Sequence, residues 1–527
     1  MLSLVNDWPL EATLLIVAIL VYALYVYQTS TFDYWLVRGV PYRKPIPLLG
    51  NFADVLLFLK SQPEGVYEMY NWFKNEPYFG VFQIRSPALV IRDPELIKSI
   101  CIKDFQIFCN RGIPVNNNNP LTGNLFNLEG KPWKLMRSKL TPVFSSGKLK
   151  NMFYLLNECS KNLVCQIERR LASSHGQDPS AIINTHDLAM DFTVDVIGSC
   201  AFGIQISALT EDSDFRRIAR KFSNSSYKDA FWRMLRSAPP KLYKLLNIQM
   251  VDSSVTKFFL NAVSQMIKER ESKHIKRHDF MDLLIDLKRK TDELNINVGA
   301  EALKNENTIS EEIVMTEDII AAQAFVFFVA GYDTSANAIA FCLYELALNP
   351  EIQQKVRCDI INTLKKSDGK LTYDAIQDMK YLDLVILESL RKYPAAASIS
   401  RCCEQPYKLP GSDVTLPKGM RVIIPVYGIH HDPNYYPDPF SFRPERFQDD
   451  KRQTLQTCTY LSFGEGPRSC IGMRFAQLQT KVGIISFLRT FKIETCEKTD
   501  IPIKFSKRSF IISTENGIWL KVLKLSE

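Results

Sequence analysis

The sequence predicts a mainly helical protein with a small β-sheet subdomain, and three observations lead to this fold class. The segment 316–348 is apolar on nearly all sides, as expected of a helix buried inside a large protein. The segments 149–168 and 373–393 have the spacing of apolar residues that is typical of helices. Short runs typical of strands are few, at 81–91, 421–426, 510–513 and 518–522.

The composition is that of a folded globular chain. Of 527 residues, 46% are hydrophobic and 23% are charged, which excludes a disordered, collagen-like or many-span membrane protein. The net charge of +8 is mild for this length and gives no reason to expect nucleic-acid binding. The 12 cysteines contain no CxxC pair, so neither a disulfide scaffold nor a zinc site is indicated. Because 31–527 contains no linker, repeat or break in composition, we expect one large domain.

Residues 1–30 are predicted to be an uncleaved membrane anchor. The stretch 12–27 carries no charge and, with its apolar flank, approaches the roughly 20 residues that span a bilayer. A cleaved signal peptide is disfavoured because no Lys or Arg precedes the stretch and no A-x-A site follows it. Arg38, Arg43 and Lys44 follow the anchor, so the positive-inside rule places the bulk of the chain in the cytoplasm.

Residues 31–52 are interpreted as a proline-rich hinge, and 53–527 as the cytoplasmic catalytic domain. Tyr34 and Trp35 are expected at the membrane interface, where aromatic side chains are enriched. Three prolines between positions 41 and 47 disfavour helix and stiffen the chain. A rigid spacer that sets the angle of the domain to the membrane and an irregular connector without such a role both fit this composition.

The long apolar segment 316–348 begins with a signal for the start of a helix and contains polar residues near its middle. Thr316 is the expected N-cap, and the two acidic residues after it complement the positive end of the helix. A second membrane span is the competing interpretation, but Asp333 and Thr334 in the middle would make it costly. Gly331 weakens a helix by about 1 kcal/mol relative to Ala, which indicates a packing or ligand reason.

Several separated motifs stand out, although each is weak alone. FGEGPRSCIG at 463–472 places Cys470 in a glycine-rich loop before a helical stretch, where backbone N–H groups favour a thiolate. AGYDTS lies at 330–335 within the long helix. Glu388 and Arg391 are three residues apart on one helix face. A lone cysteine is more often a small buried hydrophobe, and an ExxR pair is usually a solvated helix face.

Together and in this order, the motifs resemble the cytochrome P-450 haem-thiolate monooxygenases. The match comprises the pattern FxxGxxxCxG, AGxDT, ExxR, PERF at 444–447 and a WxxxR element from Trp133 to Arg137. The resemblance covers essentially the whole chain. The anchor and hinge are similar to those of the microsomal branch, which implies the endoplasmic reticulum membrane with the catalytic domain on the cytoplasmic side. FGEGPRSCIGMRF and AGYDTS look most like the insect and vertebrate group that metabolises foreign compounds.

The resemblance implies haem b as the cofactor, with O2 as co-substrate. Cys470 would be the axial thiolate of the iron, which favours O–O cleavage, and Phe463 would shape its loop. Four residues match positions that hold the haem propionates, where the planar fork of arginine suits a carboxylate: Trp133, Arg137, Arg401 and Arg468. The chain has no GxGxxG loop and no flavin motif, so we expect it to bind neither nicotinamide nor flavin.

A buried structural triad behind the haem is implied for Glu388, Arg391 and Arg446, with a role in folding rather than in chemistry. On the distal side, Thr334 and Asp333 would deliver protons to dioxygen. The alternative to a role in proton delivery is that the Thr334 hydroxyl only donates a hydrogen bond to the carbonyl of residue 330 in its own helix.

Small and apolar residues would surround the reacting atoms. Ala330 and Gly331 would leave room for dioxygen beside the helix. The expected lining of the substrate pocket is Val326, Val329, Ala330, Ala395 and Ala396. The loop 111–128 would form the roof. The segment 231–250 would either touch the membrane or belong to the core.

The predicted function is the insertion of one oxygen atom from O2 into lipophilic organic substrates, xenobiotics such as plant toxins or insecticides. The same chemistry on an endogenous sterol, fatty acid or hormone is the nearest alternative. A haem-thiolate isomerase or dehydratase and a haem-bearing binding protein are the more distant ones. Electrons would come from NADPH through NADPH–cytochrome reductase, with cytochrome b-five as a helper in part of the family. A basic face that steers this donor, or an ordinary solvated surface, is formed by Lys131, Lys134, Lys139 and Arg474.

Overall fold

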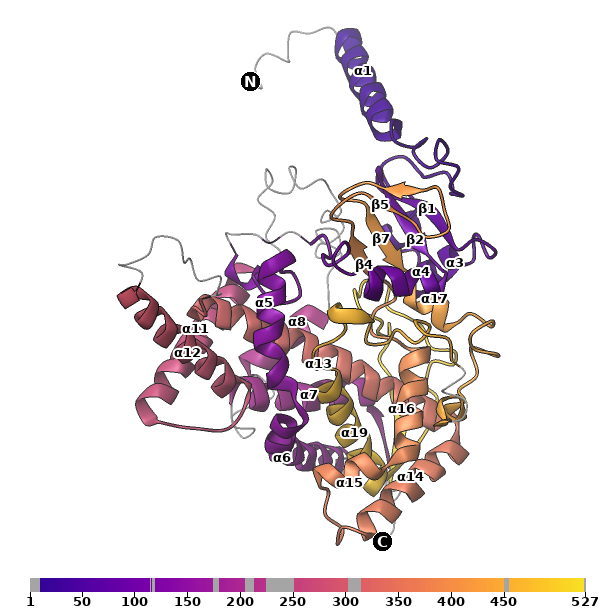
Figure 1. Cartoon of the computed structure of the whole chain (residues 1–527). Coiled ribbons are helices and arrows are strands. Elements are labelled where there is room, and N and C mark those ends of the chain that lie inside the picture. Colours follow the sequence, from indigo (N-terminus) through magenta and orange to yellow (C-terminus); the bar gives the residue numbers. More distant parts are fainter. Residues whose placement is uncertain are drawn as a thin grey trace.

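The structure is a computed structural model that describes residues 10–113, 115, 119–173, 180–203, 213–223, 251–301, 314–449 and 455–525. Helices dominate it, and one small sheet lies at the end of the molecule from which the N-terminal helix projects (Figure 1). This arrangement confirms the predicted fold class. The predicted segment 231–250 lies outside the described residues.

The helices, in chain order, are α1 (Leu10–Thr29), α2 (Ala53–Leu56), α3 (Gln62–Tyr70), α4 (Pro94–Lys98), α5 (Gly130–Leu140), α6 (Ser146–Ala172), α7 (Thr185–Phe202), α8 (Asp214–Ser223), α11 (Ser253–Lys273), α12 (Phe280–Glu301), α13 (Glu317–Leu348), α14 (Pro350–Lys365), α15 (Tyr373–Asp378), α16 (Lys380–Lys392), α17 (Val426–His430) and α19 (Met473–Thr490). The strands are β1 (Tyr78–Gln83), β2 (Ser86–Ile91), β3 (Ser180–Asn184), β4 (Ile399–Cys402), β5 (Tyr407–Lys408), β6 (Thr415–Leu416), β7 (Arg421–Ile424), β8 (Phe491–Glu494) and β9 (Trp519–Lys524).

The central helix α13 starts where the sequence predicts. The Thr316 side chain accepts a hydrogen bond from the Ile319 N–H at 3.3 Å, so it caps the helix. Most of α13 is buried among α7, α19 and neighbouring helices, which makes it a core helix rather than a membrane span. Gly331 has a packing reason, because a Cβ there would lie 2.5 Å from Ile197 Cδ1 on α7. Its small size therefore serves the contact with α7, which is the packing reason that the sequence indicated, and room for dioxygen beside it stays a prediction.

The helix predicted over 373–393 is wrong in one respect, because the chain breaks into α15 and α16 at Met379. The Asp359 carboxylate, on α14, accepts hydrogen bonds from the N–H groups of Tyr381 and Leu382, at 2.9 and 3.1 Å. These are free donors at the start of a helix, so a side chain from another element caps α16 and fixes a new beginning there.

The principal sheet has the strand order β1-β2-β7-β4. The run predicted over 81–91 is a hairpin of two antiparallel strands, and its turn contains Ile84 with a positive φ of 60°. Strands β2 and β7 are parallel, with Leu89 opposite Val422. A second sheet has the order β3-β9-β8. The strand expected at 510–513 is not formed, and the nearest pairing is the bridge between Phe505 and Thr514.

Helix α1 is 20 residues long and none of its residues is buried. Within the described residues, α1 and α13 are the helices long and apolar enough to cross a membrane, and only α1 lies outside the core. An apolar, unburied helix of this length suggests a membrane anchor. Trp35 is fully buried, with its ring packed on Gly80 of β1, so its expected place at the membrane interface was wrong. Its indole N–H donates to the Val81 carbonyl at 3.1 Å, a backbone partner that local sequence does not reveal.

Candidate active site

Cys470 lies in a tight loop directly before α19. The loop contains the 3₁₀ turn η7 (Gly466–Arg468), and Gly472 occupies the N-cap position of α19. The Cys470 N–H donates to the Phe463 carbonyl at 2.8 Å, which closes the loop. Gly466 has a φ of 73°, and a Cβ there would clash with the Cys101 carbonyl. Backbone contacts therefore set the position of the cysteine.

The Cys470 side chain is accessible to water, although protein surrounds its loop. Desolvation raises the pKa of the Cys470 thiol, whereas the Gly472 N–H and the guanidinium groups of Arg137 and Arg111 act to lower it. The backbone donor and both cations favour the thiolate, which is the form that binds a metal.

Arg468 is held by backbone carbonyls close to this cysteine. Its guanidinium lies over the Trp133 ring at 4.0 Å. Burial, with a contribution from the Arg401 cation, lowers the pKa of Arg468 to about 10. Its Nε, Nη1 and Nη2 donate to the carbonyls of Cys109, Leu125 and Leu128, at 2.8, 3.4 and 2.6 Å.

Arg137 and Arg401 are two further guanidinium groups of the site, and Arg137 is partly exposed whereas Arg401 is buried. Arg137, on α5, donates to the Ser469 carbonyl at 3.0 Å, next to the cysteine. Arg401, on β4, is only 2% exposed and donates to the Ser400 carbonyl at 3.0 Å. Its Nε is buried without a hydrogen-bond partner in the described structure. Burial lowers the pKa of both arginines, although the Cys470 thiolate opposes this for Arg137.

Arg111 is a fourth guanidinium that motif analysis missed as a site residue. It donates to the carbonyls of Phe126 and Arg468 at 2.9 and 3.3 Å, and it lies over the Phe126 ring at 4.0 Å. Burial and the cations of Arg401 and Arg468 hold its pKa well below the usual range. No motif marks a single arginine in this loop, so only the fold reveals its neighbours.

The four arginines fit a cofactor that carries carboxylates. Within the described residues, none of the four forms an ion pair with Asp or Glu. The hydrogen-bond partners found for them are neutral carbonyls, and the Arg401 Nε has none. Clustered buried cations are costly without anions, and guanidinium groups pair best with carboxylates. The two propionates of haem b would supply that charge, and the Cys470 sulfur would supply the ligand of its iron.

One face of α13 is accessible although the helix as a whole is buried. Ala330 is exposed, and Val326, Val329, Asp333 and Thr334 are partly exposed. Positions three and four apart lie on the same side of a helix, so these residues form one stripe. An accessible apolar stripe that ends in an acid and a hydroxyl suits a site that binds an organic molecule and handles protons.

The Thr334 hydroxyl donates to the Ala330 carbonyl at 2.7 Å. This contact within the helix is the alternative to proton delivery that the sequence predicted. The hydroxyl proton is therefore already used in a hydrogen bond to the helix backbone. The hydroxyl oxygen can still accept a hydrogen bond from a water molecule. Asn337 donates to the backbone carbonyl and to Oδ1 of Asp333, at 2.8 and 3.1 Å, and this orients the carboxylate.

Glu388 and Arg391 form a fully buried ion pair on α16. The Arg391 Nε and Nη2 donate to the two carboxylate oxygens at 2.7 and 2.9 Å. Arg446, in the 3₁₀ turn η6 (Pro444–Phe447), donates its Nε to Glu388 Oε1 at 3.3 Å. Arg391 also donates to the carbonyls of His430 and Pro439, at 2.7 and 2.8 Å. The structure therefore brings the three predicted residues together, with Glu388 and Arg391 fully buried and Arg446 partly exposed.

The last two predicted pocket residues and the predicted roof of the pocket lie in two different loops. Ala395 and Ala396 are half-buried in the connection between α16 and β4, and the Ala395 carbonyl accepts from the Ile512 N–H at 2.9 Å. The described part of the loop 111–128 is tied to α13 by Gln323. That side chain accepts from the Leu125 N–H at 2.9 Å and donates to the Gly123 carbonyl at 3.2 Å.

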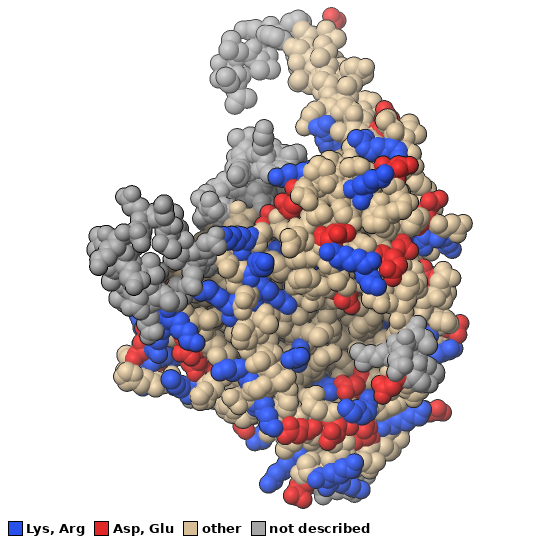
Figure 2. Space-filling model, in the orientation of Figure 1, with Lys and Arg blue, Asp and Glu red and all other residues tan. Residues whose placement is uncertain are grey.

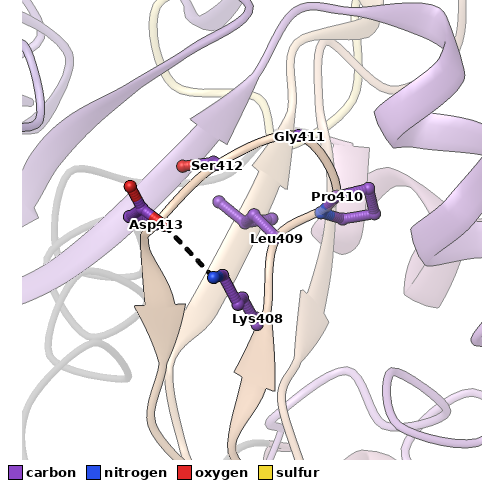
Figure 3. A pocket seen from close by; sticks show the side chains of 6 residues that line it. All are labelled: Lys408, Leu409, Pro410, Gly411, Ser412 and Asp413. Atoms are coloured by element: carbon purple, nitrogen blue, oxygen red, sulfur yellow. Dashed lines mark hydrogen bonds and ion pairs between the residues drawn. The ribbon is translucent and has the colours of Figure 1, made fainter.

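A shallow hollow formed by residues 408–413 is a separate feature (Figure 3). It lies at the turn between β5 and β6, where Lys408 and Asp413 form an ion pair at 3.1 Å. The exposed ion pair in this hollow provides neither a nucleophile nor a metal ligand comparable with a thiolate. No group of three or more His, Cys, Asp or Glu in the described part of the chain could hold a metal ion. The chemically distinctive side chains gather instead around Cys470.

Comparison with known proteins gives one consistent result. The family model described as "Cytochrome P450" matches residues 40–521. "Probable cytochrome P450 6a13" of Drosophila melanogaster is 39% identical over 95% of this chain and 96% of its own length. "Cytochrome P450 6B2" of Helicoverpa armigera is 39% identical, over 96% and 97%. "Cytochrome P450 9e2" of Blattella germanica is 37% identical, over 96% of both.

Replacing Glu388 should disrupt folding around the cysteine loop. Glu388→Ala leaves the buried Arg391 cation without its carboxylate, and a loss of this kind costs about 3–5 kcal/mol. We expect little haem in the purified variant, measured as haem per polypeptide. Glu445→Ala is the matched control, because Glu445 is partly exposed and pairs with Lys355 at 3.6 Å. Normal haem content in Glu388→Ala would contradict the structural role.

Proposed function

The chain belongs to the cytochrome P450 family and is a cytochrome P450 monooxygenase, and we propose that it oxidises lipophilic foreign compounds such as plant toxins or insecticides. The observation that supports this substrate class is the accessible stripe of residues on α13. Three of its five residues are Val or Ala, and only Asp333 and Thr334 are polar. Such a surface binds apolar molecules through burial and offers few groups that would select one polar substrate.

The family implies a haem-thiolate iron and O2, and we propose how the residues of this chain serve them. Cys470 would hold the haem through its thiolate, and the bound group would supply O2 activation with electrons from a donor, because a thiolate pushes electron density onto the iron. The Phe463 carbonyl and the Gly472 N–H hold the cysteine and its charge. Trp133 supports Arg468 by stacking. Propionate binding is proposed for Arg111, Arg137, Arg401 and Arg468.

Thr334 and Asp333 are proposed to handle protons at the distal face. Because the Thr334 hydroxyl donates to Ala330, its oxygen is positioned to accept from a water molecule on the accessible side. That water would carry the proton, and Asp333 would replenish it. In this proposal Thr334 orders a water molecule, while its own hydroxyl proton stays in the hydrogen bond to Ala330.

The same oxidation of an endogenous sterol, fatty acid or hormone is the second candidate. A tight profile with one substrate would favour it. A haem-thiolate isomerase or dehydratase has little need of proton delivery, so the accessible Asp333–Thr334 pair disfavours it. A haem-bearing binding protein would bind lipophiles stoichiometrically without forming a product that depends on NADPH.

The electron donor is proposed to be NADPH–cytochrome reductase, with cytochrome b-five as a second donor, docking on a basic face over α5. Helix α5 contains three lysines and one arginine and no acidic residue. Lys131 and Lys134 are exposed, Lys139 is partly exposed, and Arg474 is exposed at the start of α19. Basic side chains gather in this region of the surface (Figure 2). Because Arg137 of α5 contacts the cysteine loop, a donor docked here would be close to the haem ligand.

The proposed location is the endoplasmic reticulum membrane, with α1 as the anchor and residues 53–527 as the cytoplasmic catalytic domain. Two features support the orientation. Helix α1 is apolar and unburied, and basic residues follow it. Residues 31–52 are proposed as the connection, although part of this segment packs on β1 through the bridge between Tyr42 and Gly80.

The first test is the carbon monoxide difference spectrum of the reduced, membrane-expressed protein. We expect a strongly red-shifted Soret band that is lost in Cys470→His, because histidine replaces the thiolate by a neutral ligand. Cys496→Ala, which removes a partly exposed cysteine outside the loop of Cys470, is the control and should keep the band. Absence of the band in folded, haem-loaded wild type would refute thiolate ligation by Cys470.

The second test concerns Thr334. Thr334→Ala should keep haem but lose product per NADPH consumed, by about tenfold or more, with electrons appearing as hydrogen peroxide. Thr334→Ser, which retains a hydroxyl, should preserve most of the coupling. Equal coupling in wild type and Thr334→Ala, measured as product and peroxide against NADPH, would show that the hydroxyl does not serve proton delivery.

The third test reverses charge on the proposed donor face. Lys131→Glu with Lys134→Glu should raise the apparent KM for the reductase several-fold and flatten its dependence on ionic strength. Lys365→Glu with Lys366→Glu, at the end of α14, is the control. If both pairs behave alike, with unchanged peroxide-supported turnover, the basic face over α5 is an ordinary solvated surface.

A further inference from the structure

Gln323 is a buried polar residue at one end of the accessible stripe on α13. It lies three residues before Val326 and seven before Ala330, so the three share one side of the helix. The Gln323 side chain is 0% exposed, although glutamine is mostly found at protein surfaces. No motif in the sequence contains it. Because buried polar groups are hydrogen-bonded, the partners of this amide indicate its role.

Both ends of the Gln323 amide are used, and two of its three hydrogen bonds go to one distant loop. That loop is the segment 123–128, which we name the carbonyl loop. The Oε1 atom accepts from the Leu125 N–H at 2.9 Å. The Nε2 atom donates to the Gly123 carbonyl at 3.2 Å and to the Ile319 carbonyl of its own helix at 3.3 Å. The carbonyl loop is therefore fixed to α13 at one donor and at one acceptor.

The same loop holds two arginines of the candidate active site. The Leu125 carbonyl accepts from Arg468 Nη1 at 3.4 Å, and the Leu128 carbonyl accepts from Arg468 Nη2 at 2.6 Å. The Phe126 carbonyl accepts from Arg111 Nη1 at 2.9 Å, and the Phe126 ring lies 4.0 Å from this guanidinium. Three successive backbone positions of use to the site therefore belong to a loop that α13 holds in place.

The carbonyl loop is stiffened by hydrogen bonds of its own. Asn124 is 4% exposed, and its Oδ1 accepts from the N–H groups of Phe126 and Asn127, at 3.0 and 3.2 Å. Its Nδ2 donates to the Leu121 carbonyl at 2.7 Å, and its backbone carbonyl accepts from the Leu128 N–H at 3.0 Å. A loop bonded in this way transmits a displacement at one side to the carbonyls on the other side.

Leu125 is the most direct link between the long helix and the cysteine loop. Its N–H is bound by Gln323 of α13, and its carbonyl is bound by Arg468, which lies just before Cys470. Leu125 is 6% exposed, so neither backbone group would find water easily if its partner were removed. The position of the Arg468 guanidinium therefore depends on a side chain of the long helix.

We propose that Gln323 is a positioning residue for cofactor binding, which orients Arg468 and Arg111 toward the haem propionates through the carbonyl loop. The inference rests on the proposed binding of the propionates by these arginines, and it adds a residue that lies outside every motif. Because Gln323 shares a side of α13 with the accessible stripe, the same hydrogen bonds fix the stripe relative to the arginines. The substrate surface and the propionate site are thus held together by one amide.

The test compares two buried glutamines in the full chain, expressed with haem. Gln323→Met removes the hydrogen bonds and keeps an unbranched side chain of similar length. Gln353→Met, on α14, is the matched control, because Gln353 is 2% exposed and also holds a distant backbone segment. Its Nε2 donates to the carbonyls of Leu346 and Ile493 at 3.0 and 2.8 Å, and its Oε1 accepts from the Ile493 N–H at 3.1 Å.

The measured quantity is the rate at which ferric haem passes from the purified protein to excess apomyoglobin, with thermal unfolding recorded beside it. In Gln323→Met the rate should rise about tenfold, because the Leu125 N–H loses its acceptor and the carbonyl loop no longer holds the arginines. In Gln353→Met the rate should stay close to that of the wild type, although its unfolding temperature falls by a similar amount. An equal rise in both variants would overturn the positioning role.

Gln323→Glu is the conservative variant. Its carboxyl group can still accept from the Leu125 N–H, so its rate of haem transfer should lie between those of the wild type and Gln323→Met. It also replaces Gln323→Met in the comparison if that variant does not fold. A rate in Gln323→Glu above that of a folded Gln323→Met would contradict the role of the hydrogen bond to Leu125.

Arg468→Lys separates this inference from the proposed propionate site. It should also speed haem transfer, because a lysine presents a point charge in place of a planar fork. Faster transfer in Arg468→Lys with a wild-type rate in Gln323→Met would overturn the role of Gln323 and leave the propionate site standing. Wild-type rates in both would overturn both. A rise in Gln323→Met without one in Arg468→Lys would refute an action of Gln323 through Arg468.

Discussion

The buried ion pair between Glu388 and Arg391 is the interaction on which the active site depends. Both side chains are out of reach of water, and a buried charge without its partner is strongly destabilising. Arg391 donates as well to carbonyls of two distant segments, at His430 and Pro439. A single guanidinium therefore holds α16, α17 and the segment before η6 in one arrangement, and its hydrogen bonds are satisfied only when all of them are in place.

Helix α16 also fixes the start of the cysteine loop through hydrogen bonds. The loop begins with residues that bond α16 directly, since the Ser462 hydroxyl donates to the Leu390 carbonyl at 2.9 Å. His430 adds a second link, because its Nε2 accepts from the Leu461 N–H at 2.8 Å while its Nδ1 faces the Arg391 carbonyl at 2.9 Å. Burial lowers the pKa of His430 to about 3, so the imidazole stays neutral at physiological pH and can accept at one nitrogen while donating at the other. The position of Cys470 thus follows from the buried pair through short hydrogen-bonded steps.

On the other side of the cysteine, the charge balance explains why the site suits an anionic cofactor. Four guanidinium groups converge near one thiol, and their own partners in the described structure are neutral carbonyls. Burial lowers their pKa values because cations lose hydration without gaining anions. A thiolate with two propionates would offset three of these four positive charges, so the folded protein and its haem are expected to stabilise each other.

Local patterns in the sequence determined the fold class, the start of α13 at Thr316 and the cysteine loop, because capping, apolar periodicity and glycine spacing act within a few residues. They also placed Glu388 and Arg391 on one helix face, since three residues make nearly one turn. Tertiary structure alone decided the break at Met379, which Asp359 imposes from another helix, and the seat of Trp35 on Gly80. It also brought Arg111 to the arginine cluster. All three depend on partners 20 to more than 350 positions away, which sequence spacing does not encode, whereas the contact of the Thr334 hydroxyl with Ala330 lies within one turn of α13 and was already one of two interpretations of the sequence.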